Sequence, residues 1–446
     1  MKKRWGLILL AVMLVIFVIF YFTRQKNDKP ETLFNKENIE FWILSDPHYF
    51  DKSLTDSGEA YTKIKQTAAG KELDYQAESW QALIDNAIKQ KPDMLIVTGD
   101  LTLNGEKVSA EKLAELLKQL SDQGIKVFVI PGNHDVNDGW ARKFVGDKQE
   151  KTEAISIADF KEIFAACGYQ GATNYDPNSL SYSVAVNQTY DFLFLDSNIY
   201  TEDGHQLTRP TTGGTIRGRT MNWAKKQLEK SRQAKKKTLV FMHHNLYPHN
   251  EMLSNGFVLN NAEEFRQVLA DYQVQFVFSG HIHAQDIMTK TIDEQPITEI
   301  VSSSFAIAPQ SYGVVNLTNT TFDYQKKENN VDLWAKENNI PNPDILNYKK
   351  YMKEIFVEDG RKLGYAQLIE AGMEDGKELD IAADFVGEMN YRFFSGNDYS
   401  SDEEVKQLKS EQGYQIIAKY SPFLKEYLDS IMQDKNEADN QLSKDY

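Results

Sequence analysis

The sequence predicts a layered α/β fold with two facing sheets, followed by a helical region. Two observations lead to this prediction. As far as residue 325, short apolar runs alternate with amphipathic stretches, and the last runs follow one another as strands. Beyond Lys326, apolar residues instead recur at the spacing of one helix face.

The first part of the chain, as far as residue 325, is predicted to contain both strands and helices. Short apolar runs predict strands at 41–44, 94–97, 127–130, 181–186, 192–195, 238–242, 274–278, 298–301, 313–317 and 321–324. Helical spacing of apolar residues predicts helices at 76–89, 110–123, 157–164, 220–230 and 262–272. Gly124 follows the second helix as a stop signal, and Thr220 is placed to cap the fourth.

The second part predicts four helices, at 345–370, 376–394, 401–412 and 414–433. Composition and pattern then divide the chain into six segments. These are a membrane anchor (1–24), a polar linker (25–38), the α/β domain (39–325), a connector (326–343), a helical cap domain (344–433) and a tail expected to be disordered (434–446).

The N-terminus has the pattern of an uncleaved membrane anchor. Lys2, Lys3 and Arg4 precede an uncharged run from residue 5 to 22, which as a helix would be about 27 Å long. No small-x-small cleavage site follows this run. We therefore expect a membrane-anchored protein whose main domain lies outside the cytoplasm. The presence of only one cysteine, Cys167, agrees with this location, because free thiols oxidise there.

Composition excludes several classes of function. The chain has 50 Lys and Arg against 65 Asp and Glu, a formal net charge of −15. This charge repels nucleic acid polymers, so none is expected as a partner, and the sequence indicates no protein partner. One cysteine excludes an internal disulfide and any cysteine-rich zinc module. A bound metal ion must therefore use His, Asp, Glu or Asn.

Five short polar motifs directly follow five predicted strands. They are Asp46-Pro47-His48, Gly99-Asp100, Gly132-Asn133-His134-Asp135, His243-His244 and Gly280-His281-Ile282-His283. Ligands of open α/β sheets bind at the carboxyl ends of the strands, so these motifs are expected to converge. Each motif alone is common in loops, but the set predicts one site.

The residue types indicate a pair of metal ions. Imidazole, carboxylate and amide ligands suit Mn, Fe or Zn better than Mg²⁺ or Ca²⁺, which prefer oxygen ligands alone. Two divalent ions with two aspartates and a hydroxide leave a net charge of about +1, which attracts a phosphodiester. We expect two divalent or trivalent ions, Mn or Fe first and Zn as the alternative.

The five motifs, in this order, resemble those of the calcineurin-like metallophosphoesterase family: D-x-H, G-D, G-N-H-[DE], H and G-H-x-H. The resemblance covers about residues 40–325. It implies a four-layer α/β/β/α sandwich. It also implies a first metal ion on Asp46, His48 and His283, a bridging Asp100, and a second ion on Asn133, His243 and His281.

The resemblance further implies that a metal-bridging hydroxide attacks phosphorus, and that His134 binds the phosphate and protonates the leaving oxygen. His244, Asn104 and Asp135 are expected beside the ligands. Many relatives carry an acid three residues after the bridging aspartate, whereas this chain has Leu103. Two alternatives follow. Either Asn104 takes the place of that acid, or His134 acts mainly through its charge.

Within the family, MHHN, GHIH and VTGDLTLNGEK resemble the cyclic nucleotide phosphodiesterase branch, in particular membrane-anchored Gram-positive members with a helical C-terminal domain. The resemblance implies hydrolysis of small phosphodiesters, most of all 3′,5′- or 2′,3′-cyclic nucleotides. Two alternatives stay open: an envelope enzyme acting on glycerophosphodiesters or wall polymers, and an inactive membrane-tethered binding module.

Several residues outside the motifs stay open between two interpretations. His249 either contacts substrate or faces solvent, and His205 is expected at the surface. Arg217 and Arg219 either bind phosphate, or they cap a helix or face solvent. The aromatic rings of the helical region pack its core or stack on a base, and this region is expected to cap the metal cleft.

Overall fold

The computed structural model describes residues 32–137, 139–200 and 210–446. The expected anchor, the start of the linker and His205 lie outside these ranges. Within them, no helix is both long and apolar enough to cross a membrane. Residues 32–38, expected to be plain linker, are in part docked, because the backbone amides of Leu33 and Phe34 donate to Ala185 and Val186.

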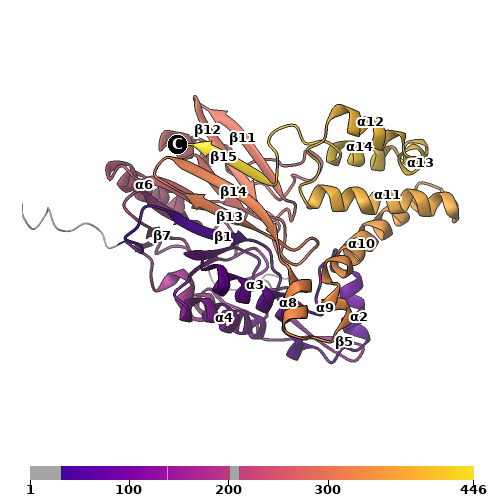
Figure 1. The fold of residues 1–446 in the computed structure, drawn as a ribbon, viewed down its shortest axis with the longest axis horizontal. Helices are drawn as coiled ribbons and strands as arrows, with labels where there is room; N and C mark the ends of the chain where they lie inside the picture. Colours follow the sequence, from indigo (N-terminus) through magenta and orange to yellow (C-terminus); the bar gives the residue numbers. More distant parts are fainter. Residues whose placement is uncertain (1–31, 138, 201–209) are drawn as a thin grey trace, which may run out of the picture.

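The first sheet has six strands in the order β15-β14-β13-β1-β2-β3 (Figure 1). Their bounds are β1 Ile39–Leu44, β2 Met94–Thr98, β3 Lys126–Ile130, β13 Ser311–Leu317, β14 Thr321–Glu328 and β15 Gln441–Asp445. β1, β2 and β3 run parallel, whereas β13, β14 and β15 add antiparallel edges. β1 and β2 are buried almost throughout, as continuous apolar runs predict.

The second sheet has seven strands in the order β11-β12-β10-β9-β8-β7-β6. Their bounds are β6 Asn174–Tyr175, β7 Tyr182–Ala185, β8 Tyr190–Phe194, β9 Lys237–Phe241, β10 Phe276–Ser279, β11 Asp286–Ile292 and β12 Gln295–Val301. The two sheets pack through aromatic rings, with the Phe41 ring centroid 5.7 Å from that of Phe278 and 5.4 Å from that of Phe192.

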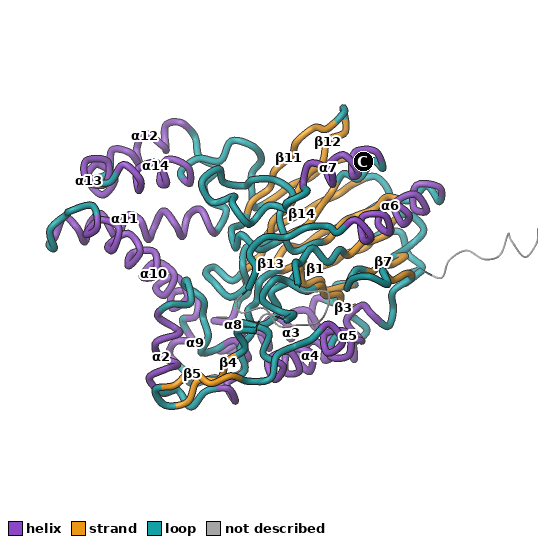
Figure 2. The backbone as a smooth tube through the Cα atoms, turned by 180° about the vertical axis from the view of Figure 1, so that it is seen from behind, coloured by secondary structure: helices purple, strands orange, loops and turns teal. Residues whose placement is uncertain are grey.

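Helices cover both outer faces, which completes a four-layer α/β/β/α sandwich (Figures 1 and 2). The sandwich helices are α2 Glu59–Gln66, α3 Gln76–Gln90, α4 Lys107–Asp122, α5 Ile157–Ile163, α6 Gly218–Gln233 and α7 Ala262–Asp271. Trp80 of α3 and Leu117 of α4 pack against the first sheet, and Trp223 and Phe265 of α6 and α7 against the second. Short elements are η1 Lys52–Leu54, η2 Ala165–Tyr169 and the hairpin β4 Arg142–Val145 with β5 Lys148–Lys151.

The helical region extends from one end of the sandwich (Figures 1 and 2). Its helices are α8 Val331–Glu337, α9 Pro343–Leu346, α10 Tyr348–Glu370, α11 Lys377–Phe394, α12 Asp402–Ser410, α13 Gln412–Tyr420 and α14 Pro422–Ile431. α10 and α11 pack closely along their lengths. The segment expected to be a connector therefore contains helix α8, whose Val331 and Ala335 are buried against α3 and α10.

The last residues of the chain form a strand, β15, and not the disordered tail that the sequence predicts. β15 pairs antiparallel with β14. Leu442 is buried, and the Tyr446 ring lies 5.4 Å from that of Phe276. The sequence pattern does not reveal this strand because it presents one buried apolar residue among exposed polar ones. The chain thus returns to the sandwich after the helical region.

Candidate metal centre

The loops after β1, β2, β3, β9 and β10 meet at the carboxyl ends of their strands. Six of the expected ligands form two groups: Asp46, His48, Asp100 and His283, and Asp100, His243 and His281. Within each group all ligand atoms lie within 4.8 Å of one another. Asp100 belongs to both groups, as a residue that bridges two ions must.

The seventh expected ligand, Asn133, joins the second group. Its Oδ1 lies 3.1 Å from His243 Nε2, which is also 3.4 Å from Asp100 Oδ1. His243 Nδ1 lies 2.9 Å from the Thr98 carbonyl oxygen and must donate to it, because a carbonyl only accepts. His243 Nε2 therefore faces two oxygens, Asn133 Oδ1 and Asp100 Oδ1, in an arrangement that a metal ion or a proton on the ring would satisfy.

The first group contains a buried acceptor that lacks a donor. Asp46 is fully buried, and its Oδ2 accepts a hydrogen bond from the His281 amide at 2.9 Å. Its Oδ1 has no hydrogen-bond partner within the described residues and lies 3.3 Å from His283 Nε2. Leaving such an oxygen unpaired is costly, whereas a metal ion would satisfy it. The donor set fits a divalent or trivalent cation.

The two buried aspartates favour a positive charge among the candidate ligands. Burial raises the pKa of Asp100, but His243 and His134 outweigh it and hold that pKa well below its usual value. Burial lowers the pKa of His281 to about 3. Burial also lowers the pKa of His243, but Asp100 and Asp46 raise it to about 9. The two carboxylates thus attract a positive charge to the point that a metal ion would occupy.

The backbone is strained at the same residues. Asp46, His48, Asp100, His281 and His283 all have positive φ, between +42° and +69°. Non-glycine residues rarely adopt this left-handed region, and its cost is accepted mainly at functional sites. The sequence gives no sign of this strain.

Gly132 illustrates why the motifs contain glycine. Its φ is not positive, so the turn itself does not require glycine. A Cβ atom at this position would lie 2.1 Å from Asp100 Oδ1. Gly132 is needed for space beside the shared carboxylate, and any side chain there would displace Asp100.

His134 has the partner that Leu103 cannot provide. Its Nδ1 lies 3.0 Å from Asn104 Oδ1, so the ring donates to the amide oxygen. Its backbone amide also donates to Asp100 Oδ1, at 2.9 Å. Asn104 therefore replaces the acid as the hydrogen-bond partner of the imidazole, although without its charge.

Asp135 connects two of the loops. Its carboxylate accepts from the amides of Leu101, Thr102 and Gly132 and from the Thr102 hydroxyl, at 2.8–3.0 Å. These bonds fix the Asp100 loop to the Asn133 loop. His244 packs its ring on that of His281, with centroids 4.4 Å apart, and Nδ1 pairs with Ser197 Oγ at 2.8 Å.

His249 differs from both of its predicted roles. It is buried, and its two ring nitrogens lie 2.9 Å from Asp286 Oδ1 and 2.8 Å from Glu299 Oε2. It therefore neither contacts the metal cavity nor faces solvent. Proximity in sequence to His243 suggested a substrate contact, but the intervening loop turns away from the cavity.

Glu299 holds the loop that carries His243. The sequence motifs did not identify Glu299 as part of the site. Its Oε1 accepts from the Leu246 amide and Ser279 Oγ, and its Oε2 from the Tyr247 amide and His249. An acid within the apolar strand ITEIV was the available signal.

Arg217 and Asp196 belong to a separate cluster. The Arg217 guanidinium lies over the Tyr200 ring, at 4.6 Å, and Tyr200 donates to Asp196. Asp196 also accepts from the Leu180 amide, at 3.1 Å, so its carboxylate has a structural role. Arg219 is exposed. Neither arginine lines the cavity above the candidate ligands.

A cavity of about 360 Å³ lies over the candidate ligands. Its polar side is formed by Asp100, Asn133, His134, His281 and His283. The helical region supplies the opposite wall, from α10, α11 and α14, as Phe356, Asp359, Gly360, Leu363, Asn390, Phe394 and Tyr427. Sequence reasoning did not identify which residues of the helical region reach this cavity, because they are distant in sequence.

Lys71 is a second residue that the sequence did not indicate. It lies in the loop before α3, and its ammonium interacts electrostatically with Asp100, Asp46 and Asp359. Burial lowers its pKa, and these three carboxylates oppose the fall. It places a positive charge near the candidate centre.

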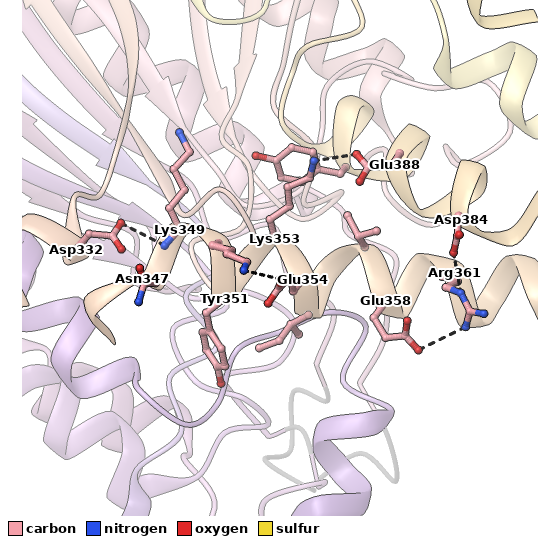
Figure 3. Close-up of a pocket in the computed structure, with 14 residues that line it drawn as sticks. Asp332, Asn347, Lys349, Tyr351, Lys353, Glu354, Glu358, Arg361, Asp384 and Glu388 are labelled. Carbon is pink, nitrogen blue, oxygen red and sulfur yellow. Dashed lines mark hydrogen bonds and ion pairs between the residues drawn. The ribbon is translucent and has the colours of Figure 1, made fainter. Parts of the chain in front are cut away.

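A larger groove lies elsewhere and carries no such chemistry. It has a volume of about 1040 Å³ and runs along α10 and α11 (Figure 3). Its charged side chains pair with acids, such as Lys353 with Glu388 at 2.9 Å and Arg361 with Asp384 at 2.8 Å. A groove whose charges are neutralised within the protein offers little to a charged ligand.

Comparisons with known proteins agree with this geometry. A family described as calcineurin-like phosphoesterase matches residues 39–285, and one described as the C-terminal domain of cyclic nucleotide phosphodiesterase matches residues 330–438. A Psychrobacter arcticus protein named probable cyclic nucleotide phosphodiesterase is 27% identical over 213 residues, which are 46% of this chain and 63% of that protein.

Two further relatives carry more specific names. A 3′,5′-cyclic adenosine monophosphate phosphodiesterase of Haemophilus influenzae is 23% identical over 56% of this chain and 72% of its own length. A probable glycerophosphodiester phosphodiesterase of Arcobacter nitrofigilis is 26% identical over 50% of this chain and 69% of its own length. The chain spans less than two thirds of the Psychrobacter protein.

Proposed function

Because the chain belongs to the calcineurin-like phosphoesterase family, we propose that it is a metal-dependent phosphodiesterase for small diesters, cyclic nucleotides above all. One observation carries the proposal. Two groups of ligands, all buried except the half-buried His283, share Asp100 below a cavity of about 360 Å³. The match to the C-terminal domain of cyclic nucleotide phosphodiesterase supports the choice of substrate.

The residues divide the work as follows. Asp46, His48 and His283 would hold one ion, Asn133, His243 and His281 would hold the other, and Asp100 would bind both. When bound, the ions stabilise negative charge on the phosphate oxygens and activate water as a nucleophile. The ligand set suits Mn or Fe, with Zn as the alternative.

His134 handles the proton of the leaving group. In its imidazolium form it donates Nδ1–H to Asn104, a bond that orients the ring for proton transfer to a substrate oxygen. Burial lowers the pKa of His134, and the Asp100 carboxylate opposes this fall. The neutral Asn104 raises that pKa less than an acid would, so His134 depends on Asp100 and on the substrate phosphate to hold its second proton.

The cavity size selects small substrates. Its volume lies near the lower end of the range for small-molecule sites, so a long polymer has no room above the candidate ligands. The helical region forms one wall, which is the role of a cap. We also propose that the N-terminal segment anchors the enzyme in a membrane with this site outside the cytoplasm.

A second candidate substrate class is the glycerophosphodiesters. It is favoured by the similarity to the Arcobacter protein that carries this name. The ligand groups serve either substrate equally, because both present a phosphodiester. The wall of the cavity therefore decides between them. An inactive binding module is disfavoured, since all seven candidate ligands converge.

Metal-dependent turnover tests the proposal. Protein stripped of metal should not hydrolyse bis-p-nitrophenyl phosphate, and added Mn²⁺ should restore turnover. Asp100→Ala should abolish it, because both ions lose a ligand. A panel of 3′,5′-cAMP, 2′,3′-cAMP, glycerophosphocholine and teichoic acid fragments then ranks the substrates. Turnover that survives both chelation and Asp100→Ala would contradict a dimetal mechanism.

A further inference from the structure

The wall of the cavity opposite the candidate ligands is mainly apolar and aromatic. Phe356 of α10 and Phe394 of α11 line it, with ring centroids 5.4 Å apart, and Leu363 lies beside them. On the sandwich side, the Phe257 ring lies 4.9 Å from that of His281. A ligand that extends from the metal ions into this space therefore meets flat hydrocarbon surfaces.

Two polar side chains interrupt this apolar wall, the Asp359 carboxylate of α10 and the Asn390 amide of α11. Asn390 of α11 lines the cavity with only 7% of its surface exposed. Its Oδ1 accepts a hydrogen bond from the Tyr427 hydroxyl of α14 at 2.8 Å. Burial raises the pKa of Tyr427, so this hydroxyl keeps the proton that it donates. With the hydroxyl as the donor, the amide oxygen faces Tyr427 and Nδ2 is the other end of the amide.

The amide nitrogen is left with protons to donate. Within the described residues, Asn390 Nδ2 makes no hydrogen bond to the protein. Gly360, which also lines the cavity, lies directly beside it, and a Cβ at Gly360 would be 2.9 Å from Nδ2. The missing side chain at Gly360 therefore keeps this donor uncovered. Burying an amide without its full set of partners is unfavourable unless a ligand completes it.

We propose that Asn390, oriented by Tyr427, recognises the nucleobase of a cyclic nucleotide whose phosphate lies on the metal ions. This inference rests on the proposed phosphodiesterase function and names the substrate class of the same cavity. The base lies against Phe356 and Phe394, and an acceptor on its edge takes a hydrogen bond from Nδ2. Bases present both features, a π face and edge acceptors.

The composition of the wall argues against other occupants. The described residues that line the cavity include no lysine or arginine, and they include the carboxylate of Asp359. The Asp359 carboxylate, whose charge Lys71 partly offsets, offers a second phosphate or a polyphosphate tail no cationic partner on this wall. A glycerol headgroup would leave the rings without a partner of matching shape. A base satisfies the apolar surface and the amide together.

Selectivity between substrates tests the inference. The measurement is kcat/KM for 3′,5′-cAMP divided by kcat/KM for bis-p-nitrophenyl phosphate, which has no base. Asn390→Asp keeps the shape and replaces the donor with an acceptor, and we expect the ratio to fall about tenfold or more. Tyr427→Phe frees the amide to rotate and should lower the ratio by a smaller factor. Tyr399→Phe is the control, because Tyr399 is 55% exposed, and it should leave the ratio unchanged.

A second measurement uses adenosine, which carries the base without a phosphate. It should inhibit turnover of bis-p-nitrophenyl phosphate by the wild type, and about tenfold more weakly in Asn390→Asp. If the wild type hydrolyses bis-p-nitrophenyl phosphate and neither variant changes the ratio or the inhibition, the inference is overturned while the phosphodiesterase proposal stands. If the wild type hydrolyses no diester with any metal, the proposed function itself fails. Should Asn390→Asp not fold, Tyr427→Phe and the adenosine measurement decide.

Discussion

Single residues that are not candidate metal ligands hold the ligand loops and His134 in place through hydrogen bonds. Asn104 accepts from His134, Asp135 joins two ligand loops, and Glu299 holds the loop of His243. Such partners often matter nearly as much as the ligands, because they set the tautomer and direction of each ring.

Replacing Asn104 should impair turnover without weakening substrate binding. Asn104→Leu removes the acceptor for His134 Nδ1–H, and we expect kcat to fall roughly 10–100-fold with little change in KM. Asn104→Asp restores an acceptor with charge and should retain or raise kcat. Steady-state kinetics on a diester measure both. An unchanged kcat in Asn104→Leu would show that this hydrogen bond does not orient His134.

His249 should make stability depend on pH. Burial lowers its pKa, but Asp286 and Glu299 outweigh burial and raise that pKa from 6.5 to about 10. The folded state therefore holds a proton that the unfolded state loses, so this contribution is complete below about pH 6.5 and disappears as pH rises toward 10. The expected slope is at most about 1.4 kcal/mol per pH unit in that window.

Denaturant unfolding of wild type and His249→Gln from pH 6 to 10 tests this. The wild type should lose stability faster with rising pH than the variant, because glutamine has no proton to release. Parallel curves would mean that His249 is neutral in the folded protein.

At the scale of elements, α10 and α11 pack closely enough to require glycine. A Cβ at Gly387 would lie 2.4 Å from the Val357 carbonyl oxygen. Alanine normally stabilises a helix interior by up to about 1 kcal/mol over glycine. Here the clash should reverse the sign, and we expect Gly387→Ala to lower the free energy of unfolding by roughly 1–2 kcal/mol.

Gly218→Ala is the matched control for this prediction. Gly218 begins α6, and nothing lies within 4 Å of the position that a Cβ would take there. This variant should gain stability slightly or not change. Equal effects at the two glycines, measured by chemical unfolding, would show that the helix contact is looser than described.

The sequence predicts most of the buried strands but not the edges. β1, β2 and β3 are continuous apolar runs, whose pattern is plain. β11 was missed because five of its seven residues are not fully buried and it forms the sheet edge. α8 was taken as a connector because it is one short helix among Asn and Pro residues, and its burial comes from contacts with α3 and α10.

At the scale of the whole molecule, the short motifs predict the candidate metal ligands but not the helical residues that form the opposite wall of the cavity. The five motifs were recognised because each follows an apolar strand, and ligands of such sheets bind at the strand ends. The resemblance to the calcineurin-like family then selected the seven candidate ligands among them. Phe356, Asn390 and Tyr427 have no such signal, since their place at the cavity depends on how the helical region folds back. The return of β15 to the first sheet is a similar long-range effect.

The number of metal ions bound per chain tests the central claim most directly. Equilibrium dialysis against Mn²⁺, followed by elemental analysis, should give two ions per wild-type chain. Asp100→Asn should bind fewer than two, because Asp100 belongs to both ligand groups, whereas Asp122→Asn on the exposed face of α4 should still bind two. One ion or none in the wild type, or two ions retained by Asp100→Asn, would contradict a centre in which Asp100 is shared.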